Sequence, residues 1–390
     1  MSFWTWTLAI ALAVFGGAWL MRALGRRLTG NAPYFRDMPY AVAFGYVAAV
    51  AAVIGGAVLW VQPNAVFFRW AVQGFVIAAA LAFVFRLAGR HIGSEGTRKA
   101  FRTMPLTAAF GILTILVYAV LAIFAGLLAP YGQAEVFAQP NMLPGGDPAS
   151  GGDPAHPLGT DQIGRDLLTR LIYGAQNTVG IAFATTCLAF LLGGSLGFLA
   201  AVIGGWFDNL LSRAVDVLMA IPSLIFALLL MTIASAWAGS ERWLLTIYMI
   251  VIIAVIDSTR VFRLARAVGQ NIVVMDYIEA AKLRGEGLRY LIFREILPNA
   301  TAPLLAEFGL RFCFVFLTIA ALSFLGVGIQ PPLADWGTMV RDLAQFINFA
   351  AFSPLAAALP LMAAGAIALL TVAVNFVVDW VLHRSSGLKD

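Results

Sequence analysis

Residues 279–298 read EAAKLRGEGLRYLIFREILP and form the most polar run in the second half of a very apolar chain. Two alanines near its start favour helix, whereas Gly285 and Gly287 allow the chain to reverse sharply. Residues 288–296 can form a second helix, and Pro298 suits the first turn of the helix that follows. The sequence therefore predicts a helix–turn–helix outside the bilayer, where a soluble partner can dock.

The composition of the whole chain is that of a membrane protein. Of its 390 residues, 61% are hydrophobic and 12% are charged, and the mean hydropathy is +0.88. Soluble domains have roughly 45–50% apolar and about 25% charged residues. The net charge of +5 comes from basic residues that cluster beside hydrophobic segments, which indicates membrane orientation rather than nucleic-acid binding. We expect an all-α integral membrane protein.

Hydropathy along the chain predicts nine membrane-spanning helices. They lie at residues 3–21, 39–61, 65–85, 106–129, 177–205, 214–236, 243–265, 299–327 and 354–382. A polar loop at 130–170, rich in Gly, Pro and Asp, separates the fourth span from the fifth. Its Asp residues lack the spacing of a calcium-binding loop, so we expect a solvated loop.

The distribution of basic residues predicts the orientation of the spans. Basic loops at 22–36, 86–102 and 260–294 should be cytoplasmic, and the acidic loop at 130–170 should lie outside. Nine alternating spans satisfy all four placements together. The N-terminus is then outside, and the C-terminus and residues 279–298 are cytoplasmic.

The chain lacks the motifs of phosphate chemistry and metal chemistry. It has no GxxxxGK[ST] loop, no GxSxG elbow and no HExxH, and its three His residues are scattered. We therefore expect no catalytic residue, no cofactor and no metal site, so the chain is not an enzyme by itself. Cys187 and Cys313 lie inside apolar segments and are predicted to be core residues.

Several motifs together resemble a known family. The EAA run, with Gly285 four residues after Ala281 and ILP further on, resembles the "EAA" cytoplasmic loop of permease subunits in bacterial ABC importers. Four segments are similar to the second (C-type) permease of the dipeptide/oligopeptide/nickel family: HPLGTDQIGRDLLTRLIYGAQNTV (156–179), DVLMAIPSLIFALLL (216–230), ILPNATAPLL (296–305) and AALSFLGVGIQPPLADWG (320–337). The resemblance covers about residues 105–390.

This resemblance implies a domain organisation and a set of partners. Residues 105–390 would form a type I permease core of six spans, with a cytoplasmic coupling hairpin at 271–298. The three spans in residues 1–104 are an addition to the family pattern. The implied partners are a second permease subunit in a heterodimer, two ABC ATPase subunits, an extracytoplasmic substrate-binding protein, a peptide substrate and the lipid bilayer. No nucleic acid is implied.

The resemblance also implies which residues couple the chain to an ATPase. In that family the EAA helix sits in a groove on the ATPase, and small Ala side chains would permit close approach. The implied coupling residues are Glu279, Ala280, Ala281, Arg284, Gly285, Arg289, Leu297 and Pro298. The alternative is a hairpin whose charges only anchor it among lipid headgroups.

Three further residues are candidates inside the predicted spans. Glu307 and Arg311 are four residues apart, in the order that favours an ion pair, roughly 14 and 20 Å beyond Pro298. We expect these two residues either to line the translocation pathway or to form a structural ion pair. Pro222 should kink its span, as a hinge or as a static bend.

Two other short segments each allow two interpretations. Arg260, Arg263 and Arg266 share one helical face and are expected to anchor their span at the interface or to extend the docking surface. Asp335-Trp336-Gly337 falls in an outside loop, where a binding protein could dock or the Trp could anchor the interface.

The favoured function is a permease subunit of an ATP-driven importer for di- or oligopeptides in the bacterial inner membrane. A proton-coupled secondary transporter is one alternative, and it predicts internal repeats and several intramembrane carboxylates. A non-transporting membrane scaffold is the other.

Overall fold

The computed structural model describes residues 66–239, 241–349 and 353–385, together with isolated helical positions between residues 16 and 56. The predicted spans at 3–21 and 39–61 fall in the part of which only those isolated positions are described. The chain divides into two units, Met1–Phe75 and Val76–Asp390, and the fold described below is that of the second. Apart from two isolated β-bridges, every named element in the described ranges is a helix, which confirms the all-α class.

Six helical runs in the described ranges are long and apolar enough to cross a membrane. They are α4 (Val66–Gly89), α6 (Leu106–Ile123), α8 (Leu167–Gly174) continued by η2 (Ala175–Val179) and α9 (Gly180–Ile203), α12 (Arg242–Val273), α14 (Leu288–Tyr290) continued by η3 (Leu291–Ile296) and α15 (Leu297–Phe324), and α17 (Pro354–Ser385). The helices α10 (Gly205–Ala220) and α11 (Ser223–Ala238) are apolar enough only as a pair, and they meet at 89°, as in a broken span or a re-entrant loop. The six runs correspond to six of the seven predicted spans between residues 65 and 382, and the predicted span at 214–236 falls in the α10–α11 pair.

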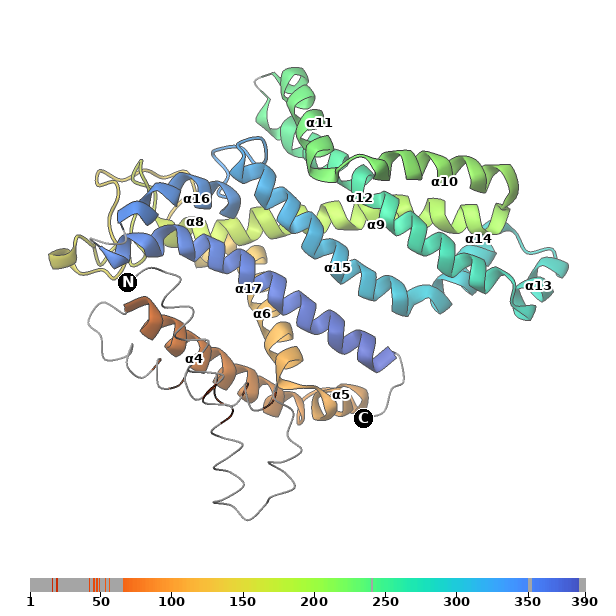
Figure 1. Ribbon diagram of the computed structural model, residues 1–390, viewed down its shortest axis with the longest axis horizontal. Helices are drawn as coiled ribbons and strands as arrows, with labels where there is room; N and C mark the ends of the chain where they lie inside the picture. Colours follow the sequence, from red (N-terminus) through yellow and green to blue (C-terminus); the bar gives the residue numbers. More distant parts are fainter. Residues whose placement is uncertain are drawn as a thin grey trace, which may run out of the picture. The chain divides into compact units, whose positions relative to one another are not determined.

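Helices α9 and α12 pack along much of their length (Figure 1). Two glycines of α9 permit the contact, because a Cβ atom at Gly193 would lie 2.3 Å from the carbonyl oxygen of Ser258. At Gly197 it would lie 2.7 Å from the carbonyl oxygen of Phe262. Small residues let apolar helices approach backbone to backbone where no hydrophobic effect drives them together.

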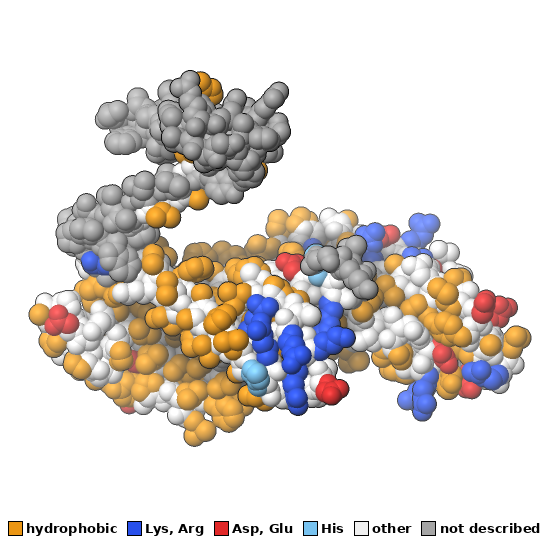
Figure 2. All heavy atoms as spheres, turned by 90° about the horizontal axis from the view of Figure 1, so that it is seen from below, with side chains coloured by type: hydrophobic (Ala, Val, Ile, Leu, Met, Phe, Trp, Pro, Cys, Tyr) orange, Lys and Arg blue, Asp and Glu red, His pale blue; other side chains and the backbone are white. Residues whose placement is uncertain are grey.

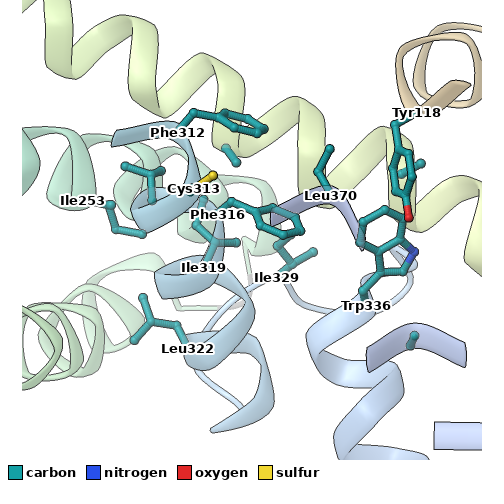
Figure 3. Packing of buried hydrophobic residues seen from close by; sticks show 14 of the residues in the cluster. Tyr118, Ile253, Phe312, Cys313, Phe316, Ile319, Leu322, Ile329, Trp336 and Leu370 are labelled. Carbon is teal, nitrogen blue, oxygen red and sulfur yellow. The ribbon is translucent and has the colours of Figure 1, made fainter. Parts of the chain in front are cut away.

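Trp336 belongs to a large hydrophobic cluster, in which it lies beside Tyr118, and it is only 1% exposed (Figure 3). Its ring meets those of Tyr118 and Phe316 edge to face, at centroid distances of 5.4 and 6.1 Å. Its indole N–H donates to the carbonyl oxygen of Leu171 at 2.9 Å. The prediction that Asp335-Trp336-Gly337 is a docking loop or an interfacial anchor was therefore wrong.

The physical reason is the short helix α16 (Trp336–Leu343), which folds back against α15 and α17. Asp335 caps this helix by accepting from the N–H of Thr338 at 2.8 Å, and it also accepts from the hydroxyl of Thr178. The Asp335 carboxyl is fully buried, and burial raises its pKa. Gly337 is required here, because a Cβ would lie 2.3 Å from the carbonyl oxygen of Ala320.

The polar loop at 130–170 is not a solvated loop in its second half, so that expectation was wrong. His156, Asp161 and Asp166 are 4%, 3% and 1% exposed. His156 Nδ1 lies 2.9 Å from Asp166 Oδ1, and Asp161 pairs with Arg165 at 2.6 Å. These carboxylates also accept from backbone N–H groups, so they serve as caps and turn formers within a folded loop.

The two cysteines differ in their surroundings. Cys313 is 6% exposed in the core of α15, as predicted. Cys187 is exposed on α9, so its prediction as a core residue was wrong. Inside a bilayer an apolar helix has apolar residues on its outer face as well, and sequence alone therefore does not separate its two faces.

Candidate coupling surface and intramembrane charge cluster

The polar stretch forms a helical hairpin at one end of the helical bundle, and α16 lies at the other end (Figure 1). Its first arm is α13 (Asp276–Leu283), which follows α12. Its second arm begins at Leu288 and runs through α14 and the π-helix η3 into α15, with Pro298 in the first turn of α15. The predicted helix–turn–helix is confirmed.

The turn between the arms depends on Gly285. Its φ of +80° lies in the left-handed region, which residues with a Cβ rarely adopt. The N–H of Gly285 donates to the carbonyl of Lys282 at 2.9 Å, and the N–H of Glu286 donates to that of Ala281 at 3.2 Å. This pair of bonds is the Schellman motif, which ends α13 and satisfies its last carbonyl groups.

One face of α13 is buried in the hairpin's own core. Ile278 and Ala281 have no exposed surface, and they belong to a hydrophobic cluster with Ile272 of α12, Leu291 of η3 and Ala300 of α15. Ala281 is therefore a packing residue of the hairpin in this conformation. Its small side chain sets how closely α13 approaches the helices beneath it.

The opposite face of α13 forms an exposed apolar surface, which we call the α13 outer face. It consists of Tyr277, Ala280 and Leu283, and the exposed Arg284 follows at the C-cap of the helix. Leu283 is 84% exposed and Tyr277 is 42% exposed, with the small Ala280 between them along the helix. The sequence did not single out Tyr277 and Leu283. The available signal was their spacing, because positions 277, 280, 283 and 284 share one helical face.

The remaining predicted coupling residues are spread over the hairpin. Glu279 is exposed beside the α13 outer face, and Arg289 is exposed on the second arm. Leu297 is half-buried and packs against the inner cluster, whereas Pro298 is exposed. Of the predicted coupling residues, Ala281 and Leu297 therefore pack inside the hairpin. The exposed ones are Glu279, Ala280, Arg284, Gly285, Arg289 and Pro298.

A charge cluster joins α12 to α15 within the spans. Arg311 lies 2.8 Å from Glu307 through its Nε atom, which confirms the predicted ion pair. Arg311 Nη1 also lies 3.6 Å from Asp257, which in turn lies 3.6 Å from Arg260. Two carboxylates and two guanidinium groups make this cluster neutral. Asp257 and Arg260 were not predicted as its members, because they lie on another helix.

A cavity of about 160 Å³ adjoins this cluster. Asp257 and Arg260 line it together with Phe314 and with Ser223 at the start of α11. The Oδ2 atom of Asp257 is buried and has no hydrogen-bond partner in the part of the chain that the structure describes. An unpartnered carboxylate oxygen beside a cavity is a binding position for a cation or a hydrogen-bond donor.

Pro222 marks the break between α10 and α11, where the two helices meet at 89°. The predicted kink is confirmed in position and is sharper than a proline alone imposes. On the α10 side of the break, Asp208 pairs with Arg266 of α12, with 2.6 Å between Asp208 Oδ2 and Arg266 Nη2. Arg266 thus connects two helices, in addition to any role as an interfacial anchor.

These features define a polytopic membrane protein with a polar hairpin at one end of its helical bundle. Residues 193–386 match the family described as "Binding-protein-dependent transport system inner membrane component". The matched range includes the hairpin, the charge cluster and the α10–α11 break. The chain belongs to this family, as its similarity to curated relatives also shows.

Among those relatives is the dipeptide transport system permease protein DppC of Haemophilus influenzae, 34% identical over 245 residues, which cover 62% of this chain and 79% of that protein. DppC of Escherichia coli K12 is 38% identical over 245 residues, covering 62% and 78%. The glutathione transport system permease protein GsiD of Pectobacterium atrosepticum is 30% identical over 246 residues, covering 63% and 76%. Each alignment leaves a large part of this chain unmatched.

Proposed function

We propose that the chain is the permease subunit of an ATP-driven importer of di- or oligopeptides and forms half of the translocation pathway. The family and the names of several relatives support peptide transport. The observation that carries the coupling role is the α13 outer face, an exposed apolar surface on a short helix whose opposite side is fully buried. Two ABC ATPase subunits, a second permease and a substrate-binding protein complete the assembly.

Coupling begins at the hairpin. Ala280 lets an ATPase groove approach α13 closely, and Tyr277 and Leu283 fill it on either side. Ile278 and Ala281 pack α13 against α12 and α15, so a displacement of α13 is transmitted to both helices. Because the hairpin makes different contacts with each nucleotide state of the ATPase, ATP biases the equilibrium between inward-facing and outward-facing conformations.

The α10–α11 break is the hinge in this scheme. Arg266 ties α10 to α12, so movement of α12 reaches the bend at Pro222 through the ion pair with Asp208. Ser223, directly after the bend, lines the cavity beside Asp257. A change in the bend therefore alters the charge cluster. Glu307 and Arg311 line the pathway here, where groups of both signs suit the two charged ends of a peptide.

The topology belongs to the same proposal. The first 104 residues contribute three spans, residues 105–390 form the six-span core, and nine spans place the N-terminus outside and the C-terminus in the cytoplasm. The hairpin then faces the cytoplasm, where the ATPases are, and the folded loop at 130–170 faces the binding protein.

Co-purification tests this function. We expect the tagged chain to copurify with an ATPase and a second permease, and the complex to show peptide-stimulated ATP hydrolysis in the presence of its binding protein. Transport by the chain alone, driven by a proton gradient, would favour a secondary transporter instead. A stable complex without peptide-dependent hydrolysis or transport would favour a scaffold.

A further inference from the structure

A large cleft lies away from the coupling hairpin and the charge cluster. It is bordered by the last turn of α4, by α5 (Glu95–Thr103), by the start of α6 and by the end of α17. Its volume is about 590 Å³. The residues that matter below are Arg86, Met104, Asp379, Trp380 and Arg384, all of which line it.

The cleft and its rim are basic. Arg86 and Arg384 line it, and Arg98, Lys99 and Arg102 are exposed on α5. Figure 2 shows Lys and Arg side chains gathered beside a broad hydrophobic surface on this side of the molecule. The acidic residue in the lining is Asp379, so the wall carries more positive than negative charge.

Arg86 has more donor capacity than its protein partners use. Its Nη2 atom donates to the carbonyl of Arg102 at a long 3.4 Å. Its Nε atom is buried and has no hydrogen-bond partner among the described residues. A guanidinium carries five N–H donors, and burying one without a partner is costly. Arg86 lines the cleft, so an anionic oxygen there would accept from the terminal nitrogens of its guanidinium group.

The floor of the cleft is apolar and consists of Met104, Pro105, Phe376 and Trp380. Met104 is 1% exposed, and in the cluster behind it Phe101 of α5 packs edge to face on Phe85 of α4 with a centroid distance of 5.3 Å. The guanidinium group of Arg384 lies over the ring of Trp380, and its Cζ atom is 5.8 Å from the ring centroid. An amphipathic helix with basic residues outward, next to a Trp at the end of a span, is typical of the membrane–water boundary.

We propose that this cleft binds the headgroup phosphate of an anionic phospholipid, with Arg86 and Arg384 as its phosphate ligands. A free phosphate ion needs the arginines but gains nothing from the apolar floor, whereas a lipid uses both. The bound lipid would link α4 and α5 to α6 and α17, and so connect the segment before residue 105 to the helices after it.

Lipid titration of the full-length chain, purified with the subunits that accompany it, tests the proposal. The thermal shift is measured against phosphatidylglycerol in mixed micelles, against phosphatidylcholine and against inorganic phosphate. We expect phosphatidylglycerol alone to stabilise the protein. Arg86→Gln and Arg384→Gln should each weaken its apparent affinity about fivefold, the factor that corresponds to one basic residue near an anionic surface.

Three further variants separate a headgroup site from a structural role. Arg86→Lys keeps the charge and should retain most of the affinity, and Asp379→Asn should raise it. Arg213→Gln removes an exposed arginine of α10 and should leave it unchanged. Equal stabilisation by phosphatidylcholine, full competition by inorganic phosphate, or unchanged affinity in both Arg86→Gln and Arg384→Gln would overturn the proposal.

Discussion

At the scale of single residues, two neighbouring alanines of the hairpin have different surroundings. Ala280 is exposed on the α13 outer face, and Ala281, one position later, has no exposed surface. Successive helical positions are rotated by about 100°, so a motif read only as "small and adjacent" hides this division. Ala281 packs in the hairpin's own core, whereas Ala280 is free to contact the ATPase in the proposed assembly.

Substituting each alanine by leucine tests the two positions separately. Ala281→Leu overpacks the inner cluster and should destabilise the purified chain by about 1–3 kcal/mol. Ala280→Leu should leave the thermal unfolding midpoint unchanged and reduce ATP-dependent peptide uptake, because the added side chain holds the ATPase groove away. Wild-type uptake by Ala280→Leu at equal membrane levels would show that the α13 outer face does not contact the ATPase.

The charge cluster supports a prediction about pairs. Arg311→Met leaves Asp257 and Glu307 without their common partner and should cost about 3–5 kcal/mol of stability, because it leaves buried charge uncompensated. Arg311→Met combined with Asp257→Asn should recover part of that loss in the same unfolding measurement. Additive losses in the double variant would show that the two side chains do not interact.

Uptake by these variants decides their place in the pathway. If Glu307→Gln and Arg311→Met proteins transport peptide as wild type does at equal membrane levels, the cluster is structural and the pathway runs elsewhere. The sequence predicted the Glu307–Arg311 pair because i,i+4 neighbours meet on any helix. It did not predict Asp257, because that contact depends on how α12 packs against α15.

At the scale of elements, the backbone reverses its direction at the hairpin turn and bends sharply at the α10–α11 break. The turn was predicted from its glycines, and the break was predicted from its proline. The angle of the break was not, because a proline sets only the local φ and the remaining bend comes from tertiary packing. The burial of Trp336 was also unpredictable, since it requires α6, α15 and α16 to converge.

The two glycines of the hairpin turn should respond differently to alanine. Gly285 has φ of +80° and open space around it, so Gly285→Ala should cost about 1–2 kcal/mol through backbone strain alone. Gly287 has φ of −81°, which alanine adopts readily, and Gly287→Ala is the matched control. Limited proteolysis of the hairpin should accelerate in the first variant only, and equal rates in the two would refute the strain argument.

The link between α10 and α12 is testable by charge exchange. Arg266→Asp should break the ion pair with Asp208 and lower peptide uptake per ATP hydrolysed, because movement of α12 no longer reaches the bend. Arg266→Asp combined with Asp208→Arg should restore the ratio in proteoliposomes. If the exchange leaves the defect in place, Arg266 acts through other groups.

At the scale of the whole molecule, the described helices agree with seven of the predicted spans when the bent pair counts as one crossing. Composition and hydropathy suffice for this level, because an apolar run of sufficient length has few alternatives in a bilayer. Composition and hydropathy did not predict that the loop at 130–170 is folded. They predicted solvated acidic residues, whereas Asp161 and Asp166 are buried because they pair with Arg165, His156 and backbone N–H groups.

Orientation gives the prediction at this scale. An epitope inserted between Gly151 and Gly152 should bind antibody in intact spheroplasts, because the proposed topology places that loop outside. An epitope after Asp390 should bind only once the membrane is opened. Accessibility of both from the same side would mean that the number of spans between them is even.

The contact between α9 and α12 has a consequence for how such a protein can move. At Gly193 and Gly197 the backbone of α9 lies so close to α12 that an added Cβ would clash with carbonyl oxygens of α12, so the two helices cannot approach further there. We therefore expect α9 and α12 to move together as one rigid unit. In the proposed transport cycle, we expect the change of shape to fall outside this pair, at the bend between α10 and α11 and in the hairpin that follows α12.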